Sequence, residues 1–259
     1  MIGIGVLGAN GRMGQAIITD LREYPDMKLV AAYARGAISV DLEDDALVCN
    51  DHDTVFATAD VILDFTSPYA LEAHLHQAAL TKKPLIVGTT GLDKEHKQLL
   101  AQAGKHIPLV YAENTSTGAN LMIYLVKHVA AFLDESFDVE ILEVHHRHKV
   151  DALSGTALAL GRAVARGRNI DFEGNASLSR SNIRRPQSIG FSAQRGGSIV
   201  GEHTVSFFGD EESFSLTHRN FSRSVLAKGA LRAATWIVQQ PPGLYTMADV
   251  LGLHELFTH

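Results

Sequence analysis

The sequence contains one cysteine, lacks a surplus of positive charge and has no long apolar run. Cys49 is the only cysteine in 259 residues, so no intrachain disulfide can form and nothing indicates an oxidising compartment. The 23 Lys and Arg residues are outnumbered by 29 Asp and Glu, which disfavours nucleic acid as a partner because phosphate contacts call for a basic surplus. The most apolar stretch, residues 119–133, is broken by Lys127 and His128 and is shorter than the roughly 20 residues that cross a bilayer. No basic region precedes the apolar start, so a signal peptide is not indicated, and we expect a cytoplasmic protein without a membrane partner.

Short apolar runs alternate with helical patterns over the first 115 residues. This alternation is typical of a parallel sheet covered by helices on both faces, and it predicts an α/β fold. After residue 114 the pattern changes to a smaller α+β arrangement, and a last helix at 225–239 could return to the first unit. We expect strands at residues 2–7, 28–33, 61–65, 84–87, 107–111 and 137–146, antiparallel strands at 189–191, 198–208 and 213–218, and a helix at 119–133 with its Leu121, Leu125 and Val129 face in the core.

Three glycines follow the first expected strand and open the next helix. A phosphate bound at such a turn needs a backbone free of Cβ atoms and the free amides of a helix N-terminus. Gly8, Gly11 and Gly14 meet that need, although the spacing is Gly-x-x-Gly-x-x-Gly rather than the commoner G-x-G-x-x-G. The turn predicts dinucleotide binding, and the alternative is a glycine turn without a ligand.

The end of the second expected strand lacks the acidic residue that usually binds the adenosine ribose. The sequence there is Ala34-Arg35, and Arg12 lies in the glycine turn. A guanidinium suits a 2′-phosphate because it combines several donors with a fixed charge. We therefore expect NADPH as the preferred cofactor, with NADH possible, unless Arg35 is only a solvated loop residue.

A cluster suited to proton transfer and anion binding lies in the stretch EVHHRHKVDALSGTA. His145, His146 and Lys149 precede Ser154 and Gly155. Histidine transfers protons near neutral pH, and lysine supplies charge or a second proton. Ser154 suits an N-cap, and Gly155 exposes helix-start amides that can receive a carboxylate. The pattern indicates reduction of a small anionic substrate.

Three other interpretations of this cluster remain open. The histidines could bind a metal, although no carboxylate or thiolate completes an obvious ligand set. The basic run could be a solvated strand end, in which His145 and His146 point to opposite sides. Ser154 could be only a helix cap.

The cluster resembles the signature of the dihydrodipicolinate reductase family, E-x-H-H-R-H-K-x-D-A-P-S-G-T-A. The resemblance extends in order through residues 8–14, 64–66, 87–91, 112–120 and 195–203. It implies a Rossmann-type domain and a smaller mixed-sheet domain that binds substrate and forms a homotetramer. It also implies NAD(P)H-dependent reduction of hydroxytetrahydrodipicolinate, with loss of water, in diaminopimelate and lysine biosynthesis. On this basis we expect a dinucleotide-binding domain at 1–115, a substrate-binding and oligomerisation domain at 116–225, and a return segment at 226–259.

Carried over by motif, the resemblance also implies a set of site residues. His145 would donate the proton with Lys149 as its partner, and no metal would be required. The substrate carboxylates would be held by His146, Ser154, Gly155 and Thr156. The cofactor would be bound by Gly8, Gly11, Arg12, Met13, Arg35, Phe65, Gly88, Thr90, Ala112, Asn114 and Thr115.

The chain departs from the family pattern at two positions. Leu153 replaces a proline, so the turn before Ser154 loses a fixed φ. Ala34 stands where many members carry an acidic residue, which agrees with a preference for NADPH. Two alternatives stay open, a non-catalytic NADPH-binding sensor and another two-domain NAD(P)H dehydrogenase acting on a small anion. Cys49 lies in an acidic loop that disfavours a thiolate, which argues against an acylating semialdehyde dehydrogenase.

Overall fold

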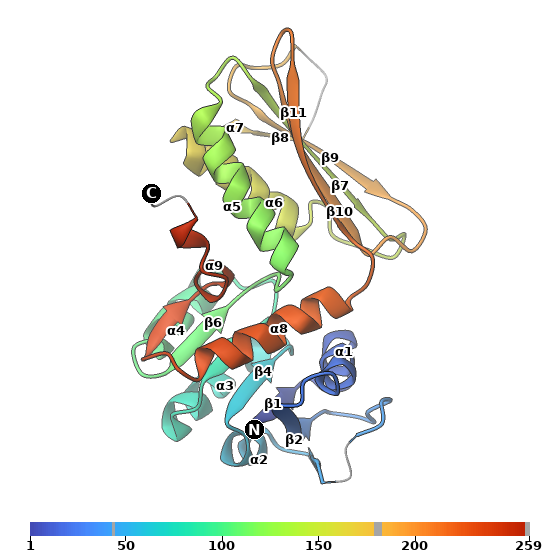
Figure 1. Cartoon of the computed structure of the whole chain (residues 1–259), viewed down its shortest axis with the longest axis vertical. Coiled ribbons are helices and arrows are strands. Elements are labelled where there is room, and N and C mark those ends of the chain that lie inside the picture. The colour runs from blue at the N-terminus through green and yellow to red at the C-terminus, as the bar shows by residue number, and fades with distance from the viewer. Residues whose placement is uncertain (43–44, 179–182, 257–259) are drawn as a thin grey trace. The chain divides into compact units, whose positions relative to one another are not determined.

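The computed structural model describes residues 1–42, 45–178 and 183–256, which form two compact units (Figure 1). The first unit comprises Met1–Thr117 and Arg223–His259, and the second comprises Gly118–Ser222. Among the described residues, no helix is long and apolar enough to cross a membrane.

The first unit contains a seven-stranded parallel sheet. Its strand order is β12-β6-β5-β4-β1-β2-β3, the doubly wound order in which the chain reverses direction between β1 and β4. Ligands bind such sheets at the carboxyl ends of the strands beside this reversal. The strands are β1 (Ile2–Leu7), β2 (Met27–Tyr33), β3 (Leu47–Cys49), β4 (Val61–Asp64), β5 (Leu85–Val87), β6 (Pro108–Tyr111) and β12 (Gly243–Tyr245).

Helices cover both faces of this sheet and bury two separate cores. Alternating strand residues supply them: Val6 belongs to the core with α1, α8 and α9, and Leu7 to the core with α2, α3 and α4. The segment after residue 223 therefore returns to the first unit and adds both a helix and an edge strand (Figure 1). The helices are α1 (Arg12–Leu21), α2 (His52–Thr58), α3 (Pro68–Thr81), α4 (Lys94–Ala103), α8 (Ser224–Ile237), α9 (Met247–Val250) and the short 3₁₀ helix Leu253–Glu255.

The second unit packs helices on a five-stranded mixed sheet of order β11-β10-β7-β9-β8. Alternation along β7 turns Val139, Ile141, Glu143 and His145 to the buried side, so an apolar row ends in two polar residues. The elements are α5 (Thr117–Phe132), β7 (Asp138–His145), α6 (Gly155–Arg168), α7 (Phe172–Asn175), β8 (Ala176–Ser177), β9 (Ile189–Arg195), β10 (Gly201–Phe208) and β11 (Ser213–Asn220).

The predicted α/β fold with a second, mixed-sheet unit is confirmed, but two local expectations are wrong. The strand at 189–195 is not antiparallel: β9 runs parallel to both β7 and β8, while β10 and β11 do pair antiparallel. The fully buried face of α5 is not Leu121, Leu125 and Val129 but Ala119, Met122, Val126 and Ala130. Leu121 is exposed, whereas Val129 is partly buried and packs against the same core.

Candidate active site

The glycine turn after β1 has a backbone path that side chains would block. Gly8 has a φ of +81°, and a Cβ there would lie 2.6 Å from the carbonyl oxygen of Phe65. A Cβ on Gly14 would lie 2.3 Å from the carbonyl oxygen of Gly8. Helix α1 begins just after Gly11, which has no side chain to cap the first amides. Those amides are left to bind an anion, so the turn fits a dinucleotide pyrophosphate.

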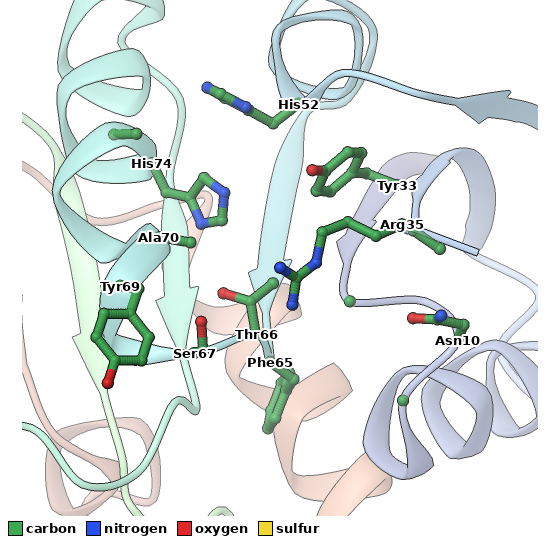
Figure 2. A pocket seen from close by; sticks show the side chains of 14 residues that line it. Asn10, Tyr33, Arg35, His52, Phe65, Thr66, Ser67, Tyr69, Ala70 and His74 are labelled. Atoms are coloured by element: carbon green, nitrogen blue, oxygen red, sulfur yellow. The ribbon is translucent and has the colours of Figure 1, made fainter.

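A cavity of about 450 Å³ opens beside this turn, lined from the ends of β1, β2 and β4 and from the start of α3 (Figure 2). Arg35 extends its guanidinium into the cavity, and Ala34 beside it offers no carboxylate. Among the described lining residues there is no Asp or Glu. The lining residues are Gly8, Asn10, Gly11, Tyr33, Ala34, Arg35, His52, Phe65, Thr66, Ser67, Tyr69, Ala70, Ala73 and His74.

Asp64, at the end of β4, fixes one wall of this cavity. Its carboxylate is fully buried and accepts hydrogen bonds from the Thr66 amide at 3.1 Å and the Thr66 hydroxyl at 2.6 Å. The other carboxylate oxygen lies 2.8 Å from Nδ1 of His74. Sequence reasoning did not single out His74 or His52. His74 lies on α3, ten residues after Asp64. That spacing was the signal from which a contact between the two side chains could have been predicted.

The remaining predicted cofactor residues lie outside the lining of this cavity. Arg12 and Met13 form the first turn of α1, while Gly88 and Thr90 follow β5 and Ala112 follows β6. Two others use their side chains within the fold. The Thr115 hydroxyl donates to the Leu226 carbonyl at 2.6 Å, and the Asn114 side chain accepts from the Ser116 amide at 2.8 Å. Thr89, which the sequence did not indicate, has a buried hydroxyl without a partner in the described part of the chain.

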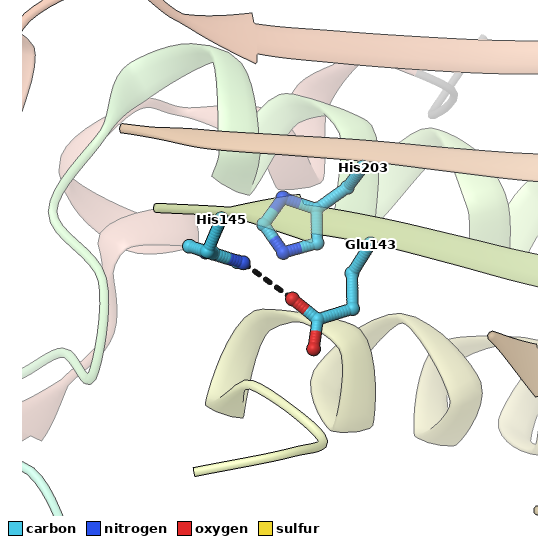
Figure 3. A group of neighbouring side chains, drawn as sticks. All are labelled: Glu143, His145 and His203. Carbon is cyan, nitrogen blue, oxygen red and sulfur yellow. Dashed lines mark hydrogen bonds and ion pairs between the residues drawn. The ribbon is translucent and has the colours of Figure 1, made fainter. Parts of the chain in front are cut away.

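A buried polar cluster in the second unit contains the predicted proton donor. His145 ends β7, and Glu143 lies two residues earlier on the same face, with His203 on β10 beside them (Figure 3). One Glu143 oxygen contacts Nδ1 of His145, and the other accepts from Arg195 Nη2 at 2.7 Å and from the Ser154 amide at 3.3 Å. Burial raises the pKa of Glu143, but the hydrogen bonds from His145 and Arg195 outweigh it and lower this pKa to about 2. Glu143 is therefore a carboxylate, and it sits at the centre of the cluster.

Ser154 caps helix α6, as the sequence predicts. Its hydroxyl accepts from the Ala157 amide at 3.2 Å and lies 3.0 Å from Nε2 of His203. Burial, followed by the charge of His145, lowers the pKa of His203 to about 4, so this ring is neutral at pH 7. The Ser154 hydroxyl and Nε2 of His203 share one hydrogen bond, whose direction is set by the tautomer of His203. The predicted substrate residues Ser154, Gly155 and Thr156 all lie at the start of α6, where a helix N-terminus suits a carboxylate.

The loop after β7 holds the other predicted substrate residues. His146 is half-buried, and Lys149 forms an ion pair with Asp151 at 2.8 Å. The peptide bond between Ala152 and Leu153 is cis. The structure thus gathers His145, Lys149, Ser154 and the start of α6 within one unit.

Contrary to the expectation that no carboxylate accompanies the histidines, Glu143 lies beside His145 and His203. Glu143, His145 and His203 offer ligand atoms that all lie within 4.8 Å of one another. Both oxygens of Glu143 already accept hydrogen bonds, and Nε2 of His203 is hydrogen-bonded to the Ser154 hydroxyl. The group is therefore arranged as a hydrogen-bond network rather than as a set of free ligands. The sequence signal for Glu143 and His145 was their spacing of two residues, which places both on one face of a strand.

Comparison with known protein families assigns both units. Residues 2–115 match the model described as dihydrodipicolinate reductase, N-terminus, and residues 118–251 match the model for its C-terminus. The chain belongs to the dihydrodipicolinate reductase family. A 4-hydroxy-tetrahydrodipicolinate reductase of Magnetococcus marinus is 43% identical, covering 97% of this chain and 98% of the relative. One from Zymomonas mobilis is 44% identical, covering 96% and 97%.

Solved structures show the same fold. The dipicolinate-bound dihydrodipicolinate reductase from Paenisporosarcina sp. TG-14 matches with a TM-score of 0.75 at 24% identity, covering 96% of this chain and 98% of that one. A scyllo-inositol dehydrogenase from Lactobacillus casei, solved with NAD(H) and scyllo-inositol, matches with a TM-score of 0.60 at 14% identity, covering 97% and 93%. Family membership favours a dihydrodipicolinate reductase over a non-catalytic sensor or another two-domain dehydrogenase.

Proposed function

We propose that this chain reduces 4-hydroxy-2,3,4,5-tetrahydrodipicolinate to tetrahydrodipicolinate, with release of water, in diaminopimelate and lysine biosynthesis. The buried pair of His145 and Glu143 beside the start of α6 carries the proposal. It combines a proton donor with helix-start amides that suit a carboxylate, which a small dicarboxylate substrate requires. The family membership of both units supports the same reaction.

The residues of the second unit would bind the substrate and move the proton. The carboxylates would be held by His146, Ser154, Gly155 and Thr156, which limits rotation of the ring. The dinucleotide, when bound, supplies the hydride. His145 would then protonate the ring atom on which negative charge develops, and the Lys149 ammonium would support that transfer through its positive charge.

NADPH is the cofactor that the cavity of the first unit suits better. Arg35 points into a cavity whose described lining has no carboxylate to pair with the ribose hydroxyls or to repel a 2′-phosphate. A guanidinium there favours the phosphate of NADPH. NADH would bind more weakly, because it has no 2′-phosphate for Arg35 to contact.

We further propose a cytoplasmic homotetramer in which residues 1–115 and 226–259 bind the dinucleotide and residues 116–225 bind substrate and form the assembly. Support comes from the family resemblance and from the fold of each unit. Light scattering on the purified chain tests the assembly, and a mass equal to a single chain would contradict it.

The activity test follows NADPH oxidation while dihydrodipicolinate synthase produces the substrate from pyruvate and aspartate semialdehyde. We expect oxidation only when both the synthase and this chain are present. Binding of NADPH without oxidation would exclude the proposed reaction and would favour the sensor.

A further inference from the structure

The Glu143 side chain contacts residues of three elements of the second unit, β7, β9 and the start of α6. This side chain is fully buried. It contacts His145 on its own strand, Arg195 at the end of β9, and the Ser154 amide at the start of α6. A carboxylate costs several kcal/mol to bury unless its oxygens are satisfied, and here all of them are. A buried charge with these partners defines how the neighbouring imidazole is held.

The contact between Glu143 and Nδ1 determines which nitrogen of His145 is left for proton transfer. A carboxylate only accepts hydrogen bonds, so Nδ1 must carry a proton in both the neutral and the charged ring. Nε2 is then the atom that gains and loses the transferable proton. It faces Gly201, where a Cβ would come within 3.1 Å.

Resting on the proposed reductase activity, we propose that Glu143 is a positioning residue: it fixes the Nδ1–H form of His145 and stabilises the protonated ring, so that Nε2 donates the proton to the substrate. Such a pairing orients the imidazole and favours its charged form. Arg195 weakens the stabilisation of the protonated His145 ring, because the Glu143 carboxylate pairs with the guanidinium as well as with the imidazole.

The other charged and titratable groups around His145 come from every neighbouring element. Lys149, paired with Asp151, lies in the loop after β7. His203 on β10 stacks edge to face with His145 at 5.2 Å between ring centroids, and His218 lies on β11. The lowered pKa of His203 leaves that ring neutral at pH 7. Glu143 is the carboxylate in direct contact with the His145 ring.

The decisive variant is Glu143→Gln, which keeps the size of the side chain and removes its charge. We expect kcat to fall at least about 10-fold, with KM changed by less than about 3-fold, because orientation and protonation of the donor are lost rather than substrate contacts. The alkaline limb of the pH profile of kcat should move to lower pH, since the protonated ring loses its counter-charge. Activity should partly recover as the pH is lowered, which a structural defect would not produce.

Glu140→Gln is the matched control. Glu140 lies on the same strand and also pairs with an arginine, Arg184, but away from His145. We expect this variant to keep the wild-type pH profile. An equal shift in both variants would overturn the proposal.

Arg195→Gln provides a second variant with the opposite expected sign. Without the guanidinium, Glu143 acts on His145 alone, so the alkaline limb should move to higher pH. If the alkaline limb of the pH profile of kcat stayed at the wild-type pH in both Glu143→Gln and Arg195→Gln, the role of Glu143 would be contradicted.

Nitrogen-15 NMR of labelled histidine tests the same point without turnover, and so separates it from the proposed activity. The His145 signals, assigned by their loss in His145→Gln, should show a protonated Nδ1 and an unprotonated Nε2 in the neutral wild-type ring. The Glu143→Gln variant should lose this single form, because a glutamine amide can both donate and accept. A wild-type ring protonated at Nε2 alone would refute the proposal even if the chain had no reductase activity.

Discussion

Gly88 and the ring of Phe65 lie directly against each other. A Cβ on Gly88 would come within 2.0 Å of the Phe65 ring, a distance at which one of the two must move. Gly88 follows β5, and its amide donates to the Asp64 carbonyl at 2.9 Å, so the backbone at this position is fixed. Phe65 in turn lines the proposed cofactor cavity. The missing side chain at residue 88 therefore determines where an aromatic wall of that cavity stands.

Gly88→Ala should displace the Phe65 ring into the cofactor cavity. We expect NADPH to bind at least about 10-fold more weakly and the free energy of unfolding to fall by about 1–3 kcal/mol, the usual cost of overpacking. Fluorescence titration and urea unfolding measure the two effects. Adding Phe65→Leu should restore part of the stability, because the smaller side chain leaves room for the new methyl group. Unchanged binding and stability in Gly88→Ala would show that the ring moves freely.

Arg35→Gln should change the choice of cofactor rather than the reaction. We expect kcat/KM with NADPH to fall by about 10- to 100-fold and kcat/KM with NADH to change little, because the lost charge pairs only with the 2′-phosphate. Arg22→Gln is the control, since Arg22 bonds the Asp41 carbonyl and does not line the cavity. An equal loss with both cofactors, or a wild-type enzyme that prefers NADH, would remove Arg35 from phosphate recognition.

His145→Ala should lower kcat by roughly 10²–10⁴ while leaving NADPH affinity nearly unchanged, because the donor acts on the substrate and lies outside the dinucleotide unit. His148→Ala, at an exposed histidine three residues later, is the matched control and should stay close to wild type. Steady-state kinetics together with NADPH titration separates the two effects. A kcat within about 2-fold of wild type would exclude His145 as the proton donor.

His203 should make stability depend on pH in mildly acidic solution. Burial lowers its pKa to about 4 in the folded state from 6.5 in the unfolded chain, so the unfolded chain binds more protons between these values. The free energy of unfolding should then decrease as the pH falls from 6.5 to about 4, by about 3 kcal/mol from this residue, and level off below. Urea unfolding at several pH values measures the slope. His203→Gln should flatten it, whereas His148→Gln should not; an unchanged slope in His203→Gln would assign the effect to other groups.

Much of the fold followed from local pattern. Apolar runs bounded by turns predicted β1, β2, β4, β5 and β6 to within a residue or two at each end. The hydrophobic pattern did not predict β3, β12 or α2, because three-residue edge strands and a seven-residue helix are too short to show a clear periodicity. It also failed for the direction of β9. Pairing direction depends on which neighbour a strand meets, and β9 meets β7 across a connection that contains two helices.

The site residues were likewise predicted only where the signal was local in the sequence. The spacing of the glycines and of the stretch from His145 to Ser154 is a local property, so the sequence could indicate a dinucleotide turn, a proton donor and a helix cap. Strand alternation places Glu143 on the same face as His145, but the sequence analysis did not single it out and could not indicate its partners. Arg195 is 52 residues away from Glu143 in the sequence, and His203 is 49 residues away from Ser154.

The sequence by itself determined which backbone turns can form and which side chains can transfer a proton, because glycine conformations, helix caps and ionisable groups are properties of single residues and short spacings. Only the tertiary structure decided how those groups are charged and held. Burial keeps His203 neutral, Arg195 and His145 keep Glu143 ionised, and Gly88 places Phe65. These outcomes depend on desolvation and on contacts between distant strands, and both arise only when the chain has packed.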